Sequence, residues 1–335
     1  MTTPRCTVAV DAMGGDRAPG EIVQGALRAA EQLGIGVLLV GRREELEPIL
    51  RAGTSPAGVQ VLDARDVIAM DDEAASAVRK KKDSSIVRCA HAVRDGRADA
   101  MVSAGNTGAA MAAALLRMGR VKGVARPAIA VPIPVPGHRP QLLVDAGATV
   151  DASPEWLVQF ARMGAAYARV RLGIEAPSVG LLSNGEEPGK GDELRKRAYP
   201  LLRDVPGFVG NVEGRDFMHP DVADVIVTDG FTGNVALKSL EGALRSLAGL
   251  VFRVLEATPE TRDASQVVLP HLLEAAEAYD PDLTGGAVLL GLNGVCVISH
   301  GSSSARAIVN AVEVAADCVT SRVVDRVKEA VVDAG

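Results

Sequence analysis

Residues 102–108, with the sequence VSAGNTG, indicate how this chain folds, and the pattern returns at residues 227–233 as VTDGFTG. Each copy follows a short apolar run and precedes a long stretch with helical periodicity. A strand that ends in small residues and turns directly into a helix leaves unpaired backbone N–H groups at the positive end of the helix dipole. Such helix N-termini bind anions. The repeat therefore predicts a cleft that holds phosphate or another oxyanion.

Outward from these two turns, apolar runs alternate with helical patterns along most of the chain. We predict strands at residues 7–10, 37–40, 59–62, 100–103, 128–133, 142–145, 178–182, 225–228 and 295–299. We predict helices at residues 19–33, 84–94, 106–118, 154–171, 192–202 and 302–332. This order is typical of a doubly wound α/β sheet with parallel strands and helices on both faces.

The length fits about two domains' worth of core, or one large α/β unit with an excursion, and we predict a single domain over residues 1–335. Apolar residues make up 47% of the chain and aromatic residues 3%, as expected when small aliphatic side chains fill a sheet buried on both faces. The net charge of −6 argues against a nucleic-acid partner, because no general positive field is present. The four cysteines show no metal-type spacing, so we expect reduced thiols and no metal site.

No secretion signal or membrane span is predicted. The N-terminus runs directly into a strand, and the charge-free residues 283–305 are interrupted by Gly, Asn, His and Ser. We therefore expect a cytoplasmic protein, a location that still allows contact with a membrane surface.

Residues 235–278 depart from the alternation, because they hold two consecutive helical patterns without a strand between them. Thr258-Pro259 predicts the start of the second helix, and Pro270 predicts a kink or break within it. We predict a helical hairpin excursion, which packs on the core or on a second subunit, or contacts lipid. The apolar residues expected at these contacts are Leu247, Leu250, Val251, Phe252 and Leu269.

Six loops of one style follow predicted strands. They lie at residues 11–16, 103–108, 145–148, 183–187, 229–234 and 299–304. In a doubly wound sheet such loops gather at the carboxyl edge, where ligands bind. We therefore predict that the six loops form one site. Neither a P-loop nor a G-x-G-x-x-G motif is present, so nucleotide binding has no direct support.

The chain resembles the bacterial phosphate acyltransferase family in segments spread over nearly its whole length. The segments are VAVDAMGGD (8–16), MVSAGNTGA (101–109), NGEE-x-x-KG (184–191), VTDGFTGNVALK (227–238), GGAVLLGLNG (285–294) and SHGSS (299–303). The resemblance implies transfer of a fatty acyl group from acyl carrier protein to inorganic phosphate, without an organic cofactor. The acyl phosphate would feed glycerol-3-phosphate acylation in phospholipid synthesis.

The resemblance also implies a fold and an assembly. The fold is similar to the isocitrate/isopropylmalate dehydrogenase-like α/β/α sandwich. The family is dimeric and associates peripherally with the inner face of the cell membrane through the hairpin, which would place it near a glycerol-3-phosphate acyltransferase.

The reaction requires a bound phosphate, an oriented thioester and donors for the oxyanion of the tetrahedral intermediate. We predict catalytic roles for Lys190, which lies between two glycines, and for Asn234 and His300. His300 would act as a general base or as a donor to phosphate. The structural alternatives are an exposed loop lysine, a polar first-turn asparagine and a histidine bonded to a backbone carbonyl. Phosphate or oxyanion contacts are predicted at Gly105, Asn106, Thr107, Gly108, Gly230, Thr232, Gly233 and Ser302.

The carboxylates near the predicted site, and Cys296, are expected to have structural and not catalytic roles. Asp11 and Asp16 flank a Gly-Gly turn and are expected to cap it, since carboxylates repel phosphate. Glu186 and Glu187 are expected to hold Lys190. An acyl-cysteine route through Cys296 is disfavoured, because a cysteine within an apolar strand is commonly buried.

Arg79, Lys80, Lys81 and Lys82 form the densest basic run in this acidic protein. Such runs are commonly solvated helix faces. The functional alternative is electrostatic docking of the acidic acyl carrier protein.

Three rival functions remain open. The first is a short-chain phosphotransacetylase acting on acyl-CoA, and the long apolar hairpin argues against it, because acetyl transfer needs no membrane contact. The second is a metal- and nicotinamide-dependent dehydrogenase, for which the chain lacks an aspartate cluster with an arginine pair. The third is a non-catalytic acyl- or membrane-binding scaffold, against which the intact glycine loops argue.

Overall fold

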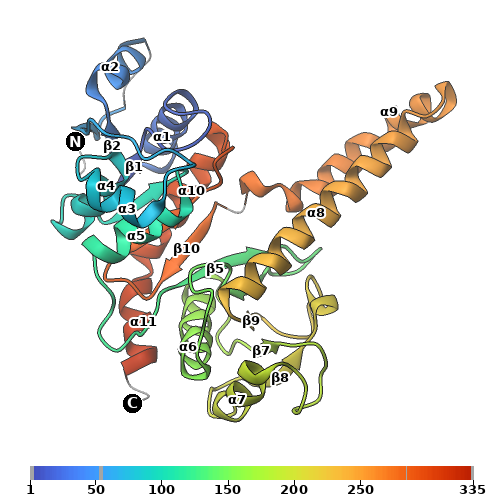
Figure 1. Cartoon of the computed structure of the whole chain (residues 1–335). Helices are drawn as coiled ribbons and strands as arrows, with labels where there is room; N and C mark the ends of the chain where they lie inside the picture. The colour runs from blue at the N-terminus through green and yellow to red at the C-terminus, as the bar shows by residue number, and fades with distance from the viewer. Residues whose placement is uncertain (1–3, 53–55, 284, 333–335) are drawn as a thin grey trace.

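An 11-stranded mixed sheet lies at the centre of the computed structural model, which describes residues 4–52, 56–283 and 285–332 (Figure 1). The strand order is β3-β2-β1-β4-β11-β10-β5-β6-β9-β7-β8. The strands are β1 (Thr7–Asp11), β2 (Gly36–Gly41), β3 (Val59–Asp63), β4 (Ala100–Ser103), β5 (Ala128–Ile133), β6 (Gln141–Val144), β7 (Val179–Leu182), β8 (Phe208–Val212), β9 (Val225–Val227), β10 (Ala287–Leu290) and β11 (Val295–Ile298). Most of the central strands are short apolar runs buried on both faces, as expected for strands covered by helices on each side.

Eleven α-helices occur within the described residues. They are α1 (Gly20–Leu33), α2 (Arg43–Ala52), α3 (Ala74–Lys80), α4 (Ser85–Arg94), α5 (Thr107–Arg117), α6 (Pro154–Arg171), α7 (Glu193–Leu202), α8 (Gly230–Leu255), α9 (Pro259–Ala276), α10 (Ala305–Thr320) and α11 (Val323–Val332). One core cluster packs α1, α6, α7, α10 and α11 against one face of the sheet. The other packs α3, α4, α5 and the start of α8 against the opposite face.

The predicted helix starts follow from local capping chemistry. Ser153 Oγ accepts a hydrogen bond from the Trp156 N–H, and Pro154 occupies the first turn of α6. Thr258 and Thr261 form a reciprocal capping box at the start of α9. Every predicted strand is present, and so is every helix predicted outside residues 235–278 and 302–332, with ends that shift by no more than one residue. The first helix of the predicted hairpin begins at Gly230, five residues before the predicted bound.

The prediction of a parallel sheet is wrong at its centre. β10, which is not predicted from the sequence, pairs antiparallel with both β11 and β5, and β5 pairs antiparallel with β6. β10 is hidden in the sequence because Gly286 and Gly291, both with positive φ, flank its four residues, and such glycines are typical of turns. As a result, β6, β9, β7 and β8 run along the sheet in the direction opposite to β1, β4 and β11.

Two helix predictions also need correction. The single helix expected over residues 302–332 is divided into α10 and α11 at Ser321 and Arg322, where Arg322 adopts a left-handed φ of 55°. Pro270 does not end α9, which continues through it to Ala276. The short elements α2, α3 and β8 are not predicted from the sequence. The two ends of the predicted domain, residues 1–3 and 333–335, lie outside the described residues.

Helices α8 and α9 lie side by side and project away from the sheet (Figure 1). Among the described residues, α8 buries only Gly230 and Gly233, and α9 buries none. The exposed large apolar side chains on the two helices include Leu247, Leu250, Phe252, Val254, Val267, Val268 and Leu273. In the described part of the chain, no helix is both long enough and apolar enough to cross a membrane.

Candidate active site

The six glycine-rich loops fall into two groups at opposite edges of the sheet. The first group follows β1, β4 and β11, and the second follows β6, β7 and β9. Because the strand direction reverses at β10 and β5, the predicted single carboxyl edge is wrong.

Sheet twist brings the two groups back toward a common direction. Neighbouring strands rotate by about 20–25°, so the steps from β4 through β11, β10, β5 and β6 to β9 accumulate roughly 100–125°. Because β9 runs antiparallel to β4 along the sheet, this twist leaves their carboxyl ends within roughly 55–80° of each other in direction. The helices that follow, α5 and α8, also pack in the same core cluster. The two copies of the repeated turn therefore lead into helices that pack on the same face of the sheet.

Asp11 joins two loops of the first group from inside. Its carboxylate is buried, and Oδ2 accepts a hydrogen bond from Ser103 Oγ at 2.7 Å. Ser103 Oγ in turn accepts from the Gly105 N–H at 3.1 Å. Gly14 allows this approach, because a Cβ there would lie 2.8 Å from the Gly105 nitrogen. Burial raises the pKa of Asp11. The contacts fit the structural role expected of Asp11.

Asn106 caps α5 and holds the segment before α3. Its Oδ1 accepts from the Ala109 N–H at 2.9 Å, and its Nδ2 donates to Met70 O at 2.9 Å and to Asp72 O at 3.2 Å. These bonds occupy the side-chain amide. What the turn offers an anion is the pair of first-turn backbone N–H groups at Thr107 and Gly108, which have no partner within the helix.

His300 and Ser302 form the third loop of the first group. His300 Nδ1 lies 2.8 Å from Ser302 Oγ and accepts the Ser302 backbone N–H at 3.3 Å. A backbone N–H always donates, so Nδ1 is the acceptor of this hydrogen bond, which favours the tautomer with the proton on Nε2. Gly301 O accepts from the Asp16 N–H at 2.8 Å, which joins this loop to the loop after β1. His300 is exposed and presents an N–H donor at Nε2.

Asp145 organises the loop after β6. It is buried, and its two oxygens accept four backbone N–H groups at 2.7–3.0 Å, from Ile129, Gly147, Ala148 and Thr149. Burial raises the pKa of Asp145, and the four donors oppose that rise by favouring the ionised form. These four hydrogen bonds hold the loop after β6 against the start of β5.

The start of α8 rests directly on this Asp145 loop. A Cβ at Gly233 would overlap the Asp145 carbonyl oxygen, and a Cβ at Gly230 would lie 2.7 Å from Asp145 Oδ2. Both positions thus require glycine for packing. Asn234 is exposed and donates one N–H to Ala146 O at 3.2 Å, which orients its side chain at the helix start.

Arg195 is a functional candidate that no sequence motif predicts. It is buried, and Nε donates to Leu182 O at 3.1 Å while Nη1 donates to Asp192 Oδ2 at 2.9 Å. Its Nη2 donates to Thr228 Oγ1 at 2.7 Å and to Asp229 Oδ2. Burial alone would raise the pKa of Asp229, but the hydrogen bonds from Thr232 and the ion pair with Arg195 lower it overall. The partner Asp229 lies 34 positions away in the sequence, so no local pattern reveals the pair.

Lys190 is exposed, and its stem lies over Gly185, where a Cβ would come within 2.7 Å of Lys190 Cγ. Of the two glutamates expected to hold Lys190, Glu186 pairs with Arg215 at 2.9 Å instead, whereas the Glu187 carbonyl oxygen accepts the Lys190 backbone N–H at 2.9 Å. The loop is also closed by the Gly191 N–H, which donates to Asn184 Oδ1 at 2.8 Å. In the part of the chain that the structure describes, Lys190 has no ion-pair partner.

The basic run divides into structural and exposed cations. Lys81 Nζ donates to Val67 O at 3.0 Å and pairs with Asp72, whose pKa this hydrogen bond lowers. Arg79, Lys80 and Lys82 are exposed. Only these three are available to a partner, so the predicted docking role does not extend to Lys81.

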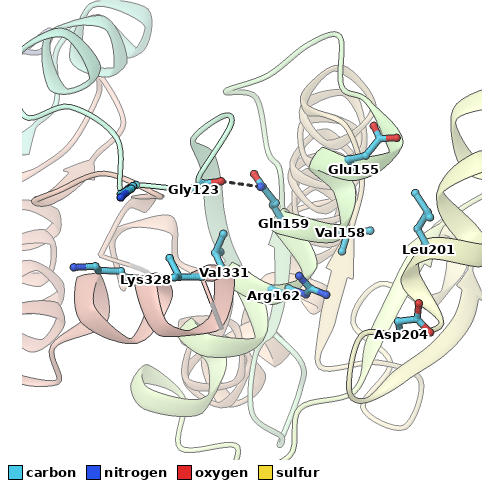
Figure 2. A pocket seen from close by; sticks show the side chains of 11 residues that line it. Gly123, Glu155, Val158, Gln159, Arg162, Leu201, Asp204, Lys328 and Val331 are labelled. Carbon is cyan, nitrogen blue, oxygen red and sulfur yellow. Dashed lines mark hydrogen bonds between the residues drawn. The ribbon is translucent and has the colours of Figure 1, made fainter. Parts of the chain in front are cut away.

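Neither the cysteines nor the groove between α6, α7 and α11 supports a role in the predicted reaction. All four cysteines are buried, and burial raises the pKa of Cys296 to about 12, which gives no support to an acyl-cysteine route. An open groove of about 690 Å³ lies between α6, α7 and α11, where Gln159 Nε2 donates to Gly123 O at 3.0 Å (Figure 2). These helices cover the face opposite to α5 and α8.

Comparisons with known proteins cover almost the whole chain. A family model described as "Fatty acid synthesis protein" matches residues 6–326. The chain is 50% identical over 324 residues to a phosphate acyltransferase from Desulfitobacterium hafniense, covering 96% of both chains. It is 48% identical over 326 residues to one from Heliobacterium modesticaldum, again covering 96% of both.

Solved structures show the same fold at low sequence identity. A phosphotransacetylase from Streptococcus pyogenes matches with a TM-score of 0.61 and 18% identity, covering 94% of each chain. A 4-hydroxythreonine-4-phosphate dehydrogenase from Klebsiella pneumoniae matches with a TM-score of 0.53 and 13% identity, covering 92% of this chain and 98% of the other.

Proposed function

The chain belongs to the phosphate acyltransferase family, and we propose that it transfers a fatty acyl group from acyl carrier protein to inorganic phosphate for phospholipid synthesis. The observation that carries the activity is the 50% identity over 96% of both chains with a phosphate acyltransferase. The glycine-rich loops and the two helix N-termini supply the kind of anion site that the reaction needs.

We assign the phosphate to the second group of loops on electrostatic grounds. A phosphate dianion needs a positive partner, and Lys190 is the only cation among the predicted catalytic residues. The amide of Asn234 has one N–H beyond the bond to Ala146, and it lies at the positive end of α8. Lys190 and Asn234 would therefore hold phosphate between the loop after β7 and the start of α8.

The first group of loops would hold the thioester carbonyl. Neutral N–H and O–H donors suit an oxyanion that forms only in the transition state. The donors here are the backbone N–H groups of Thr107 and Gly108 and the Nε2–H of His300, whose ring the Ser302 hydroxyl orients by donating to Nδ1. A phosphate oxygen attacks the carbonyl carbon, the oxyanion collapses, and the thiolate leaves with little acid assistance, because thiols have modest pKa values.

The acyl donor would dock on the exposed cations Arg79, Lys80 and Lys82. They lie at the end of α3, which packs on α5 and so borders the proposed carbonyl site. An acidic carrier protein is attracted to such a patch by electrostatic steering.

The hairpin and the assembly complete the proposal. Residues 235–278 form an excursion from a single acyltransferase domain, 1–335, in the isocitrate/isopropylmalate dehydrogenase-like α/β/α class. The exposed apolar residues of α8 and α9 would contact a second subunit of a homodimer and the inner face of the cell membrane. The protein would then act in the cytoplasm at the membrane surface, beside a glycerol-3-phosphate acyltransferase.

The test is release of free thiol from palmitoyl-acyl carrier protein with and without phosphate, with acetyl-CoA as a competing substrate. Phosphate-dependent release from the long-chain thioester alone is expected. Release from acetyl-CoA alone would reassign the protein as a short-chain phosphotransacetylase. No release from either would refute the proposed activity and favour a non-catalytic scaffold.

A further inference from the structure

We propose that Arg195 is a positioning residue that holds the loop carrying Lys190 and the helix start carrying Asn234 in one fixed arrangement. The inference rests on the proposed roles of Lys190 and Asn234 in binding phosphate. Arg195 itself is buried and touches neither phosphate nor the acyl group in this assignment.

The guanidinium connects two strand ends and two helix caps. Leu182 ends β7 and Thr228 follows the end of β9, and both accept hydrogen bonds from Arg195. Asp192 caps α7 and Asp229 caps α8, and both carboxylates also accept from Arg195. The planar fork of arginine presents five N–H donors in fixed directions, an arrangement that the single ammonium group of lysine cannot reproduce.

The backbone beside Lys190 packs directly on this side chain. Gly191 has a φ of +98°, and a Cβ there would overlap Arg195 Cβ and lie 3.0 Å from Ser183 Oγ. Together with the Gly191–Asn184 hydrogen bond, this contact fixes where the Lys190 loop leaves the sheet. A shift of Arg195 would therefore move the loop and the start of α8 together.

Arg195 also neutralises a charge that opposes phosphate binding. Asp229 lies at the start of α8, five residues before Asn234, and its lowered pKa keeps it ionised. A carboxylate at this position would repel a phosphate dianion. The buried ion pair cancels that charge and keeps Asp229 available to cap α8 at the Thr232 N–H.

The activity test compares Arg195→Met with a matched control. Arg171→Met removes another arginine that forms an ion pair, with Asp317 at 3.3 Å, on the face away from the loops. Loss of Arg195 is expected to raise the KM for phosphate roughly 10- to 100-fold, because misplaced binding groups lose that much. The KM for the acyl donor should change much less, and Arg195→Lys should recover part of the loss. Arg171→Met should leave both KM values unchanged.

A double-mutant comparison tests the link to Lys190. If Arg195 acts through Lys190, the change Lys190→Met should cost much less in the Arg195→Met background than in the wild-type protein. Independent effects that multiply would overturn the proposal, as would a loss in the Arg195 variant confined to kcat or to the acyl donor.

Amide hydrogen exchange tests the same link without using activity. In Arg195→Met, the backbone amides of residues 183–191 and of residues 229–235 should both exchange faster than in the wild-type protein. In Arg171→Met, exchange should be unchanged in both segments. Acceleration in one segment alone, or in neither, would refute the proposal even if the phosphate assignment were wrong. If Arg195→Met does not fold, Thr228→Val removes one acceptor and keeps the ion pair. A smaller joint acceleration is then expected, and unchanged exchange would count against the link.

Discussion

Polar side chains at the strand ends divide into those that bond the protein's own backbone and those left open to a ligand. Asn106 and Asp145 belong to the first kind, since their side chains hold neighbouring loops. Lys190 and His300 are exposed and belong to the second. The sequence could predict all four as loop residues but not this division, because the same amide or carboxylate atoms serve either a cap or a ligand.

The hydrogen bonds of His300 predict that it acts as a donor and not as a base. Because Nδ1 accepts from Ser302, the tautomer with the proton on Nε2 is favoured. His300→Gln keeps an N–H donor of similar reach and should retain most of the activity. His300→Ala should lose roughly 10²–10³-fold in kcat, the usual cost of one oxyanion donor. Steady-state kinetics of the two variants decide this, and an inactive glutamine variant would restore the general-base interpretation.

Among the secondary-structure elements, the position of α8 depends on two glycines in its first turn, where a Cβ atom would not fit. Its first turn holds Gly230 and Gly233 because the Asp145 loop leaves no room for a Cβ. Further along the helix, Gly242 has open space around the position of its missing Cβ. The sequence presents these glycines alike, but the packing gives them opposite consequences.

Two alanine substitutions in α8 should therefore change stability in opposite directions. Gly233→Ala is expected to lower the free energy of unfolding by about 1–3 kcal/mol, because its Cβ overlaps the Asp145 carbonyl oxygen. Gly242→Ala should raise it by about 0.5–1 kcal/mol, because alanine loses less backbone entropy on folding into a helix. Urea unfolding of both variants is the measurement. Equal changes in the free energy of unfolding of the two variants would contradict the close packing of the start of α8 on the Asp145 loop.

The segment after α3 allows a similar separation of docking from folding. Lys80→Glu with Lys82→Glu should raise the KM for acyl carrier protein several-fold at low salt, and the effect should shrink as salt screens the charges. Lys81→Met should instead reduce stability, because Lys81 bonds Val67 O and Asp72. The KM at two salt concentrations and thermal unfolding of each variant check both statements. An unchanged KM in the double variant would exclude this docking patch.

At the level of the complete chain, the direction of the strands decides where the site can form. Local patterns correctly predict nine of the strands, since a short apolar run is visible within a short window. They do not reveal that β5 and β10 reverse the sheet, because pairing direction depends on contacts between distant segments. Without that reversal, the loops after β9 and β4 would lie on a single edge.

The projecting helices α8 and α9 carry the prediction for the assembly. Leu247→Asp should reduce binding to vesicles of phosphatidylglycerol and phosphatidylethanolamine roughly tenfold or more, since a buried leucine contributes about 1.5–3 kcal/mol. Ser246→Asp adds the same charge to the neighbouring position and should have little effect. Vesicle co-sedimentation and sedimentation equilibrium are the measurements. A loss of dimer mass would assign Leu247 to the subunit contact, and no change in either would refute the proposed role.

The candidate site was predictable in its parts but not in its assembly. Lys190, Asn234 and His300 stand out because each lies in a glycine-rich loop after a strand. Arg195 does not, because an arginine in the first turn of a helix is an ordinary surface residue unless a buried carboxylate faces it. Its role depends on Asp229, which only the folded sheet brings into contact.

Most of the secondary structure, the helix caps and the family membership were therefore contained in the sequence, because periodicity, cap residues and collinear motifs act over short stretches of chain. The tertiary structure alone decided the antiparallel centre of the sheet, the two loop groups and the Arg195–Asp229 pair. The physical reason is that strand pairing and buried charge pairing join residues that are far apart in sequence. Their free energy depends on how the whole core excludes water, and no short window of residues reports that.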